Sequence, residues 1–235
     1  MALPKPIRPE YSTTIPSSGK KIKYQPFSVR EEKILMLAAE SQDKDEISNA
    51  VVNVLTNCVT HPSDFKVEEL ALFDIEFLFL KTRAKSAGEL IKVVITDPDD
   101  PNFTTTHEIN IDKIGVVKTE GHSDLIQIDE ETSIKMRYPD ISFFAEGLDT
   151  SNVENNTKLI SRCISQIIVG EEVFNRSDMT DEEVDEWLDG LTMDKYGKFS
   201  EFFNTMPKLA HKITLKNTNT GKNFTLELEG LADFF

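Results

Sequence analysis

The chain has 235 residues, and its 41 acidic against 26 basic side chains give a formal net charge of −15 at pH 7. Hydrophobic residues make up 39% of it and include fifteen Phe, which excludes a disordered chain because burial on this scale offsets the ordering entropy. Its longest apolar stretches fall far short of the roughly 20 residues of a membrane helix, and two cysteines cannot form a framework of disulfides. Residues 1–9 hold no apolar segment typical of a secretory signal, so we expect synthesis in a reducing cytosol.

Positive charge gathers near the N-terminus. Up to Lys33, seven basic side chains stand against three acidic ones, so the rest of the chain is strongly acidic. An acidic surface repels phosphate backbones, and the short basic segment has little aromatic interleaving for nucleic-acid bases. We therefore expect a protein partner and no nucleic acid. Because the apolar segments are too short to span a bilayer, we also expect no membrane partner.

Residues 1–26 contain five of the ten prolines and a turn at Ser17–Gly19, a pattern that predicts an extended basic arm. Residues 27–89 are predicted to form the N-terminal helices. The first begins at Ser28, where Glu31 completes a capping box. Two more are expected at Glu46–Cys58 and Val67–Ala87, and the latter is apolar nearly all round, which is typical of the centre of a core.

Residues 90–140 are predicted to form a β module, residues 141–207 a helical segment, and residues 208–235 a C-terminal β hairpin and tail. The β module has a strand, loop, strand unit followed by two more strands: Leu90–Thr96, Thr105–Ile111, Leu125–Ile128 and Ser133–Tyr138. Helical spacing then predicts three helices: Ser151–Val169, Thr180–Leu191 and Phe199–Met206. The C-terminal hairpin joins His211–Lys216 to Phe224–Leu228 through a polar turn.

The two hairpins share one pattern of strand, polar loop and alternating strand. They read "IKVVITDPDDPNFTTTHEINIDKI" and "HKITLKNTNTGKNFTLELEGL". We expect these distant segments to pair, so that the C-terminal hairpin and tail join the β module. The predicted fold class is therefore α+β, with a helical core and a small β module built from two strand-loop-strand hairpins.

No metal or nucleotide motif is complete. Asp97, Asp99 and Glu108 have the spacing of calcium-loop ligands, but Pro101 and Asn102 stand where a ligand and the turn-making glycine belong, which favours a solvated loop. The segment "SSGKK" lacks the earlier glycine and the hydroxyl of a phosphate-binding loop. We expect no metal, no cofactor and no small-molecule substrate.

The cysteines give no clear site either. Cys58 and His61 have ligand spacing but no second pair, and Cys58 lies on an apolar helix face, which favours a buried thiol. Cys163 lies on the same kind of face, and none of the four histidines can be placed beside either thiol as a catalytic base.

Aromatic residues in two places are candidates for partner binding. The segment from Glu171 to Asp189 has nine acidic side chains and one Arg, with Trp187 on an apolar stripe that either packs on its own core or docks on a partner. Phe234 and Phe235 at the chain end either pack back or insert into a neighbour.

Three stretches together resemble one protein family: Tyr11–Ser41, Phe73–Glu89 and Phe202–Phe235. They contain "STTIPSSGKKIKYQPFSVREEKILMLAAES", "FDIEFLFLKTRAKSAGE" and "GLADFF". The chain is similar, over nearly its whole length in order of elements, to the baseplate hub proteins of T-even-type tailed bacteriophages, whose members are hub subunits or hub assembly factors.

The resemblance implies a non-enzymatic structural or assembly component of the baseplate hub of a contractile-tailed phage. Such a protein binds other baseplate or tail hub proteins, in the virion tail or in the host cytoplasm during assembly, and self-association stays open. One alternative is a dedicated assembly chaperone that is absent from the mature virion. Another is a metal-dependent or thiol-dependent enzyme.

The resemblance also bears on the two hairpins. Members of the family often carry a Cys-x-x-Cys turn in each, like the halves of a zinc ribbon. The matching positions here are Asp97 and Asp100, then Asn217 and Thr220. The resemblance thus implies a zinc-ribbon-like module without the cysteines, held by strand pairing and packing.

For the basic arm we expect docking onto an acidic neighbour. The charge complementarity would come from Lys20, Lys21 and Lys23. The contact area would come from Tyr11, Ile15 and Tyr24, with the arm ordering as it binds.

Overall fold

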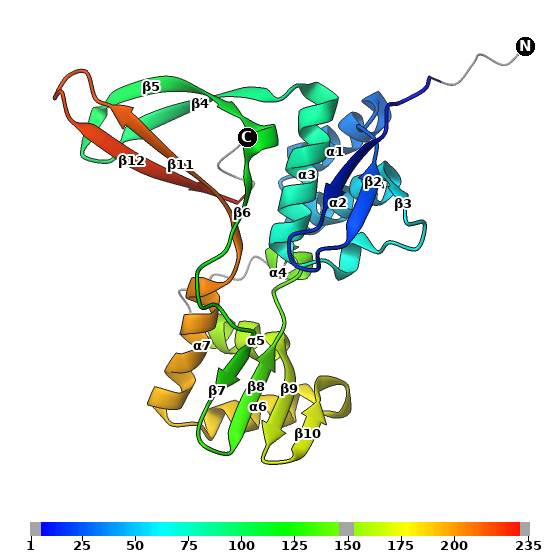
Figure 1. The fold of residues 1–235 in the computed structure, drawn as a ribbon, viewed down its shortest axis with the longest axis vertical. Coiled ribbons are helices and arrows are strands. Elements are labelled where there is room, and N and C mark those ends of the chain that lie inside the picture. Colours follow the sequence, from blue (N-terminus) through cyan, green and yellow to red (C-terminus); the bar gives the residue numbers. More distant parts are fainter. Residues whose placement is uncertain (1–5, 146–152, 231–235) are drawn as a thin grey trace, which may run out of the picture. The chain divides into compact units, whose positions relative to one another are not determined.

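The computed structural model describes residues 6–145 and 153–230 (Figure 1). Two compact units make up the chain: unit 1 comprises Met1–Val117 and Lys208–Phe235, and unit 2 comprises Lys118–Pro207. Both combine helices with small antiparallel sheets, so the predicted α+β class is confirmed. No helix in the described ranges is both long enough and apolar enough to cross a membrane.

Three helices form the N-terminal part of unit 1. Helix α1 (Val29–Ser41) starts at the predicted capping box, and α2 (Lys44–Cys58) starts where Asp43 accepts a hydrogen bond from the Glu46 amide at 3.0 Å. A short 3-10 turn, η1 (Val67–Glu69), precedes α3 (Leu72–Ala87). Helix α3 buries side chains on nearly every side, as its sequence predicts, because it packs against helices and strands of the same unit.

A small antiparallel sheet lies beside these helices, with strand order β1-β2-β3. Strands β1 (Tyr11–Thr14) and β2 (Lys21–Tyr24) pair through the tight turn at Ser17–Gly19, and β3 (Val59–His61) follows α2 directly. Within the described residues 6–26, the segment is therefore not a free extended arm. From Tyr11 to Tyr24 it forms a β hairpin that belongs to unit 1 (Figure 1).

The rest of unit 1 is built from the two similar hairpins. Strand β4 (Leu90–Asp97) pairs with β5 (Asp100–Asn110), and β11 (Lys208–Lys216) pairs with β12 (Asn223–Glu229). The turn η2 (Ile111–Lys113) leads from the first hairpin to β6 (Gly115–Val117), which pairs with β11 to give the order β12-β11-β6. One hydrophobic cluster joins both hairpins to α3, with the Phe103 and Phe224 rings edge to face at 6.1 Å.

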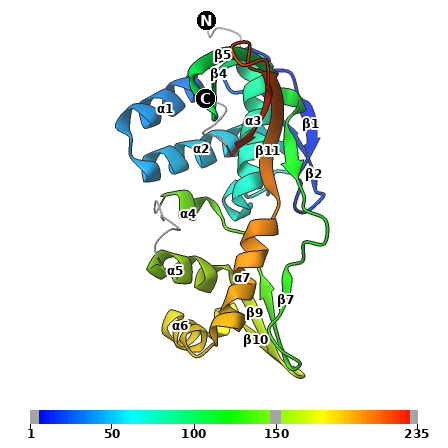
Figure 2. The same cartoon turned by 90° about the vertical axis from the view of Figure 1, so that its left-hand side faces the viewer.

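Unit 2 has a four-stranded antiparallel sheet in the order β10-β9-β8-β7. The strands are β7 (Leu125–Gln127), β8 (Thr132–Met136), β9 (Ile164–Val169) and β10 (Glu172–Asn175). The helices are α4 (Ile141–Ala145), α5 (Val153–Cys163), α6 (Asp181–Asp189) and α7 (Met193–Thr205), with a 3-10 turn η3 (Arg176–Asp178) after β10. Figure 2 shows α5, α6 and α7 on one side of the sheet, where they bury a common apolar cluster.

Two expectations differ from this arrangement. Residues 164–169, predicted as the second half of a helix over Ser151–Val169, form β9 instead, since β-branched side chains there pair with both β8 and β10. The predicted β module of residues 90–140 is also divided. Of its last two strands, β7 pairs with β8 and β8 pairs with β9, and both belong to unit 2.

Candidate protein-binding site

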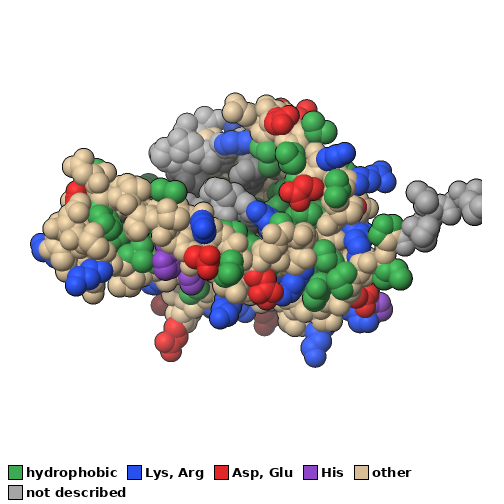
Figure 3. Space-filling view, turned by 90° about the horizontal axis from the view of Figure 1, so that it is seen from above, with side chains coloured by type: hydrophobic (Ala, Val, Ile, Leu, Met, Phe, Trp, Pro, Cys, Tyr) green, Lys and Arg blue, Asp and Glu red, His purple; other side chains and the backbone are tan. Residues whose placement is uncertain are grey.

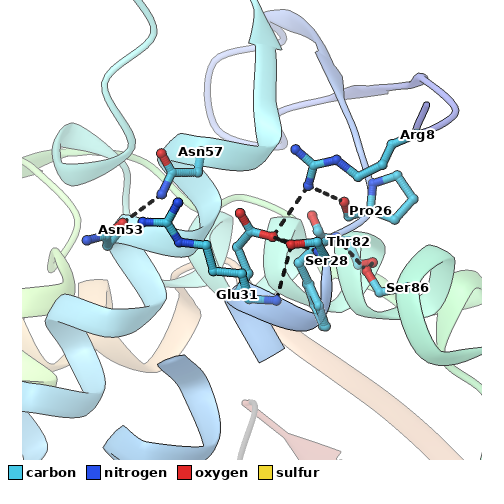
Figure 4. Close-up of polar contacts among 10 residues, drawn as sticks. Arg8, Pro26, Ser28, Glu31, Asn53, Asn57, Thr82 and Ser86 are labelled. Carbon is cyan, nitrogen blue, oxygen red and sulfur yellow. Dashed lines mark hydrogen bonds and ion pairs between the residues drawn. The ribbon is translucent and has the colours of Figure 1, made fainter. Parts of the chain in front are cut away.

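The N-terminal segment is fixed to the start of α1 by a polar network (Figure 4). Glu31 accepts hydrogen bonds from the backbone amide of Ser28 at 2.6 Å and from its hydroxyl. The Arg8 guanidinium lies 3.5 Å from the same carboxylate and donates to the carbonyl of Pro26 at 2.9 Å. These hydrogen bonds lower the pKa of Glu31 against the opposing effect of burial, so the charged carboxylate holds residue 8 against the helix cap.

The hairpin behind this network is attached along its apolar face. Ile15, Ile22 and Tyr24 are at most 2% exposed, and the backbone amide of Ser17 donates to Asp74 of α3 at 3.1 Å. Burial raises the pKa of the Tyr24 hydroxyl to about 12. The hairpin therefore packs as part of the core of unit 1.

Tyr11 also faces inward. Its ring lies 5.9 Å from that of Tyr24, and the Lys85 ammonium lies over it at 5.5 Å. Lys85 itself pairs with Glu89 at 2.6 Å and with Asp112 at 2.9 Å, contacts that raise its pKa. Burial within unit 1 corrects the expectation that Ile15 and Tyr24 supply contact area for a neighbour. Tyr11 is only partly buried, so for this side chain the expectation stays a prediction.

The three lysines of the hairpin are exposed, but they are not equivalent. Lys23 pairs with Glu10 at 2.9 Å and lowers the pKa of that carboxyl, and Lys20 lies over the Phe65 ring at 5.2 Å. Lys21 projects from the strand between them. In the view of Figure 3, basic side chains lie among acidic and hydrophobic ones rather than in a single basic field.

A second polar cluster joins the two similar hairpins at the positions that match the family's cysteine turns. The side-chain amide of Asn217, which is fully buried, donates to Asp97 at 2.7 Å and to Asp100 at 3.2 Å. Its carbonyl oxygen accepts from the backbone amides of Asn219 at 2.8 Å and Thr220 at 3.1 Å. Each hairpin turn therefore directs a polar side chain toward the other, across 120 residues of sequence.

These residues do not fit a zinc ion. Zinc in such ribbons takes thiolate or imidazole ligands, whereas here two carboxylates already receive the hydrogens of a neutral amide. Thr220 contributes its backbone amide rather than a ligand. Within residues 6–145 and 153–230, no group of three or more His, Cys, Asp or Glu side chains is arranged to hold a metal ion.

The remaining candidate residues lie elsewhere. Trp187 is partly buried against the apolar cluster of unit 2, beside the buried Leu188 of the same helix. Phe234 and Phe235 lie outside the described residues. Cys58 and Cys163 are buried free thiols, and burial raises their pKa values to about 11 and about 12, which opposes thiolate formation.

Sequence reasoning missed the residues that anchor the hairpin. Arg8 and Asp74 make contacts with residues 23 and 57 positions away, and nothing local predicts them. The available signal is that Asp74 stands between Phe73 and Ile75 in a largely apolar helix, in which Glu76 is a second acid. A carboxylate in such a helix indicates a hydrogen-bond donor from another segment, because buried polar groups are paired.

Comparison with known proteins identifies the family. The model of the family described as T4 bacteriophage base plate protein matches residues 8–235. The chain belongs to this family. The matched range covers the anchored hairpin, both units and the two similar hairpins, so the protein is a structural component of a phage baseplate. No curated protein and no solved structure matches the chain.

Proposed function

We propose that this baseplate protein acts at the central hub, as a permanent subunit or during hub assembly, and that it works by binding other tail proteins without catalysis. The observation that carries the proposal is the lysine-bearing hairpin β1–β2 on an otherwise acidic chain. Contacts with other parts of unit 1 hold it in place: Arg8 pairs with Glu31, Glu10 accepts from the Thr60 hydroxyl of β3, Ser17 donates to Asp74, and Ile22 is buried. A surface held this firmly binds with little loss of conformational entropy.

This mechanism differs from an arm that orders on binding. The backbone of the hairpin is already positioned, so Lys20, Lys21 and Lys23 present charge at fixed points to an acidic neighbour. Such charges steer association and set orientation more than they add affinity. The buried thiols with raised pKa values speak against the thiol-enzyme alternative.

The test uses phage that carry variants of the full chain. Removing residues 1–26 would expose the core beneath Ile15, Ile22 and Tyr24, so charge reversal is the cleaner perturbation. Lys20→Glu with Lys21→Glu should reduce incorporation or cross-linking to hub proteins. The matched control is Lys33→Glu with Lys44→Glu, which reverses the same number of charges at exposed sites on α1 and in the first turn of α2.

Mass spectrometry of purified particles and of cross-linked infected-cell lysate gives the readout. Stoichiometric presence in particles identifies a hub subunit, whereas presence only in the lysate, cross-linked to hub proteins, identifies an assembly chaperone. Equal incorporation of the hairpin variant and the control would refute the role of the hairpin. Absence of any cross-link to hub proteins would refute the hub assignment.

A further inference from the structure

The sheet of unit 2 has an open edge at β10. This strand ends the order β10-β9-β8-β7, and all four of its residues are exposed. Val173 and Phe174 on it are 52% and 44% exposed. An edge strand with apolar side chains and unpaired backbone groups is a ready template for an additional strand.

The register of the sheet shows that Phe174 continues a buried row. Ile126 is opposite Ile134, Ile134 is opposite Ile167, and Ile167 is opposite Phe174. The three isoleucines are at most 9% exposed beneath the helices, whereas the last member of the row is nearly half exposed. The row of apolar side chains on the helix-covered face therefore extends to the edge strand, where its last member, Phe174, is only partly covered.

The charges beside this edge define what would complement it. Glu171 precedes β10 and Glu172 is its first residue, and both side chains are exposed. The nearby cation, Arg176, donates to Asp181 and to the carbonyl of Met179. An added strand would thus meet carboxylates at one end and an apolar side chain in the middle.

We propose that β10 binds an extended, lysine- or arginine-bearing segment of another protein as a fifth strand of this sheet. The inference rests on the proposed protein-binding function and names a surface for it in unit 2. In an antiparallel pairing, the residue opposite Phe174 is apolar and the residue opposite Glu172, two positions further along the bound segment, is basic. Backbone hydrogen bonds supply affinity, and these two side chains supply selectivity.

A second copy of this chain fits less well. Two copies that pair through β10 about a two-fold axis must place side chains from the same face of the sheet opposite one another. Phe174 would then lie opposite Phe174 of the other copy, or Val173 opposite Val173 of the other copy. Within the described part of the chain, the cation next to this edge is Arg176, which already pairs with Asp181. The net charge of −15 on each copy also opposes their association.

The experiment uses the full-length chain and a capped synthetic peptide, Ser-Thr-Val-Thr-Lys-Lys, which puts Val opposite Phe174 and Lys opposite Glu172. Hydrogen exchange of the β10 amides is followed as the peptide is titrated to about 1 mM, a concentration that detects even weak binding. The control peptide has Pro in place of the second Thr, so it keeps the charge but loses a backbone donor. We expect at least about tenfold slower exchange in β10 with the first peptide and no change with the second.

Two variants test the side chains. Phe174→Lys, and independently Val173→Lys, should abolish the protection, because a charge on an edge strand blocks pairing. Leu125→Lys is the matched control, since Leu125 is 47% exposed on β7 at the opposite edge of the same sheet. Circular dichroism confirms that each variant is folded.

Three outcomes would overturn the proposal. They are no protection at the highest peptide concentration, equal protection by the proline peptide, and protection that appears without peptide as the protein concentration rises, which would indicate a second copy. Any of them leaves the proposed hub function standing, because incorporation into particles tests that function separately.

Discussion

Replacing Asn217 tests whether a hydrogen-bonded amide holds the two similar hairpins together. Asn217→Ala removes two donated bonds to carboxylates and two accepted bonds from backbone amides. It also removes the donor that lies 2.7 Å from Oδ2 of Asp97, a residue that is 4% exposed. A hydrogen bond to a charged group contributes about 1.5–3 kcal/mol, and a buried group left unpaired costs about as much again.

The expected loss in free energy of unfolding is about 3–4 kcal/mol, a large share of the roughly 5–15 kcal/mol that stabilises a domain. For a unit of this size it lowers the melting temperature by about 10 °C. Thermal and urea denaturation followed by circular dichroism measure both quantities. Asn219→Ala is the matched control, because that exposed side chain leaves the backbone amide in place and should change stability by less than about 0.5 kcal/mol.

A double-mutant cycle with Asp97→Ala isolates the pair. The coupling energy between the two positions should be at least about 1 kcal/mol, since the residues are in direct contact. If Asn217→Ala is no less stable than Asn219→Ala, or if the two losses simply add, the amide does not hold the hairpins together.

The remaining predictions concern burial and protonation. Ile22→Ala should lower the free energy of unfolding by about 2–4 kcal/mol in urea denaturation, whereas Lys21→Ala should change it by less than about 0.5 kcal/mol; equal losses would show that the hairpin is not packed as described. Cys58 and Cys163 should react with a thiol reagent only after denaturant is added, because burial raises their pKa values to about 11 and about 12; fast labelling of the native chain would contradict this. Burial lowers the pKa of His122, so the unfolded state binds the proton more readily and stability should fall as pH drops below about 6.5. In stability measurements across pH 4–8, His122→Gln should flatten that fall, and an unchanged slope would assign the pH dependence to other groups.

The helix starts were predictable because a capping box is a local interaction. Ser28 with Glu31, and Thr180 with Glu183, lie three residues apart and need no other segment to form. Period-two alternation likewise predicted the second strand of each similar hairpin, and the apolar character of α3 predicted its burial.

The resemblance to the protein family implied that Asp97 and Asn217 occupy matching turns. It did not predict the hydrogen bond between them, since a turn position does not fix the direction of a side chain. For β9 the sequence was ambiguous: Ile164 and Ile167 fit a helical stripe and a buried strand equally well. The adjacent strands β8 and β10 decide between the two.

By itself, the sequence determined the class of the fold and the contrast between an acidic body and a basic N-terminal strip. It also determined the family resemblance. The family match over residues 8–235 supports this resemblance as far as a baseplate protein. Only the tertiary structure decided that the strip is an anchored hairpin rather than a free arm, because Ile15, Ile22 and Tyr24 need a surface to pack against that α3 and its neighbours supply. It also decided which edge of a sheet stays open, since strand order depends on contacts between segments far apart in the chain. Local patterns fix local hydrogen bonds, whereas burial and edge exposure are properties of the assembled fold.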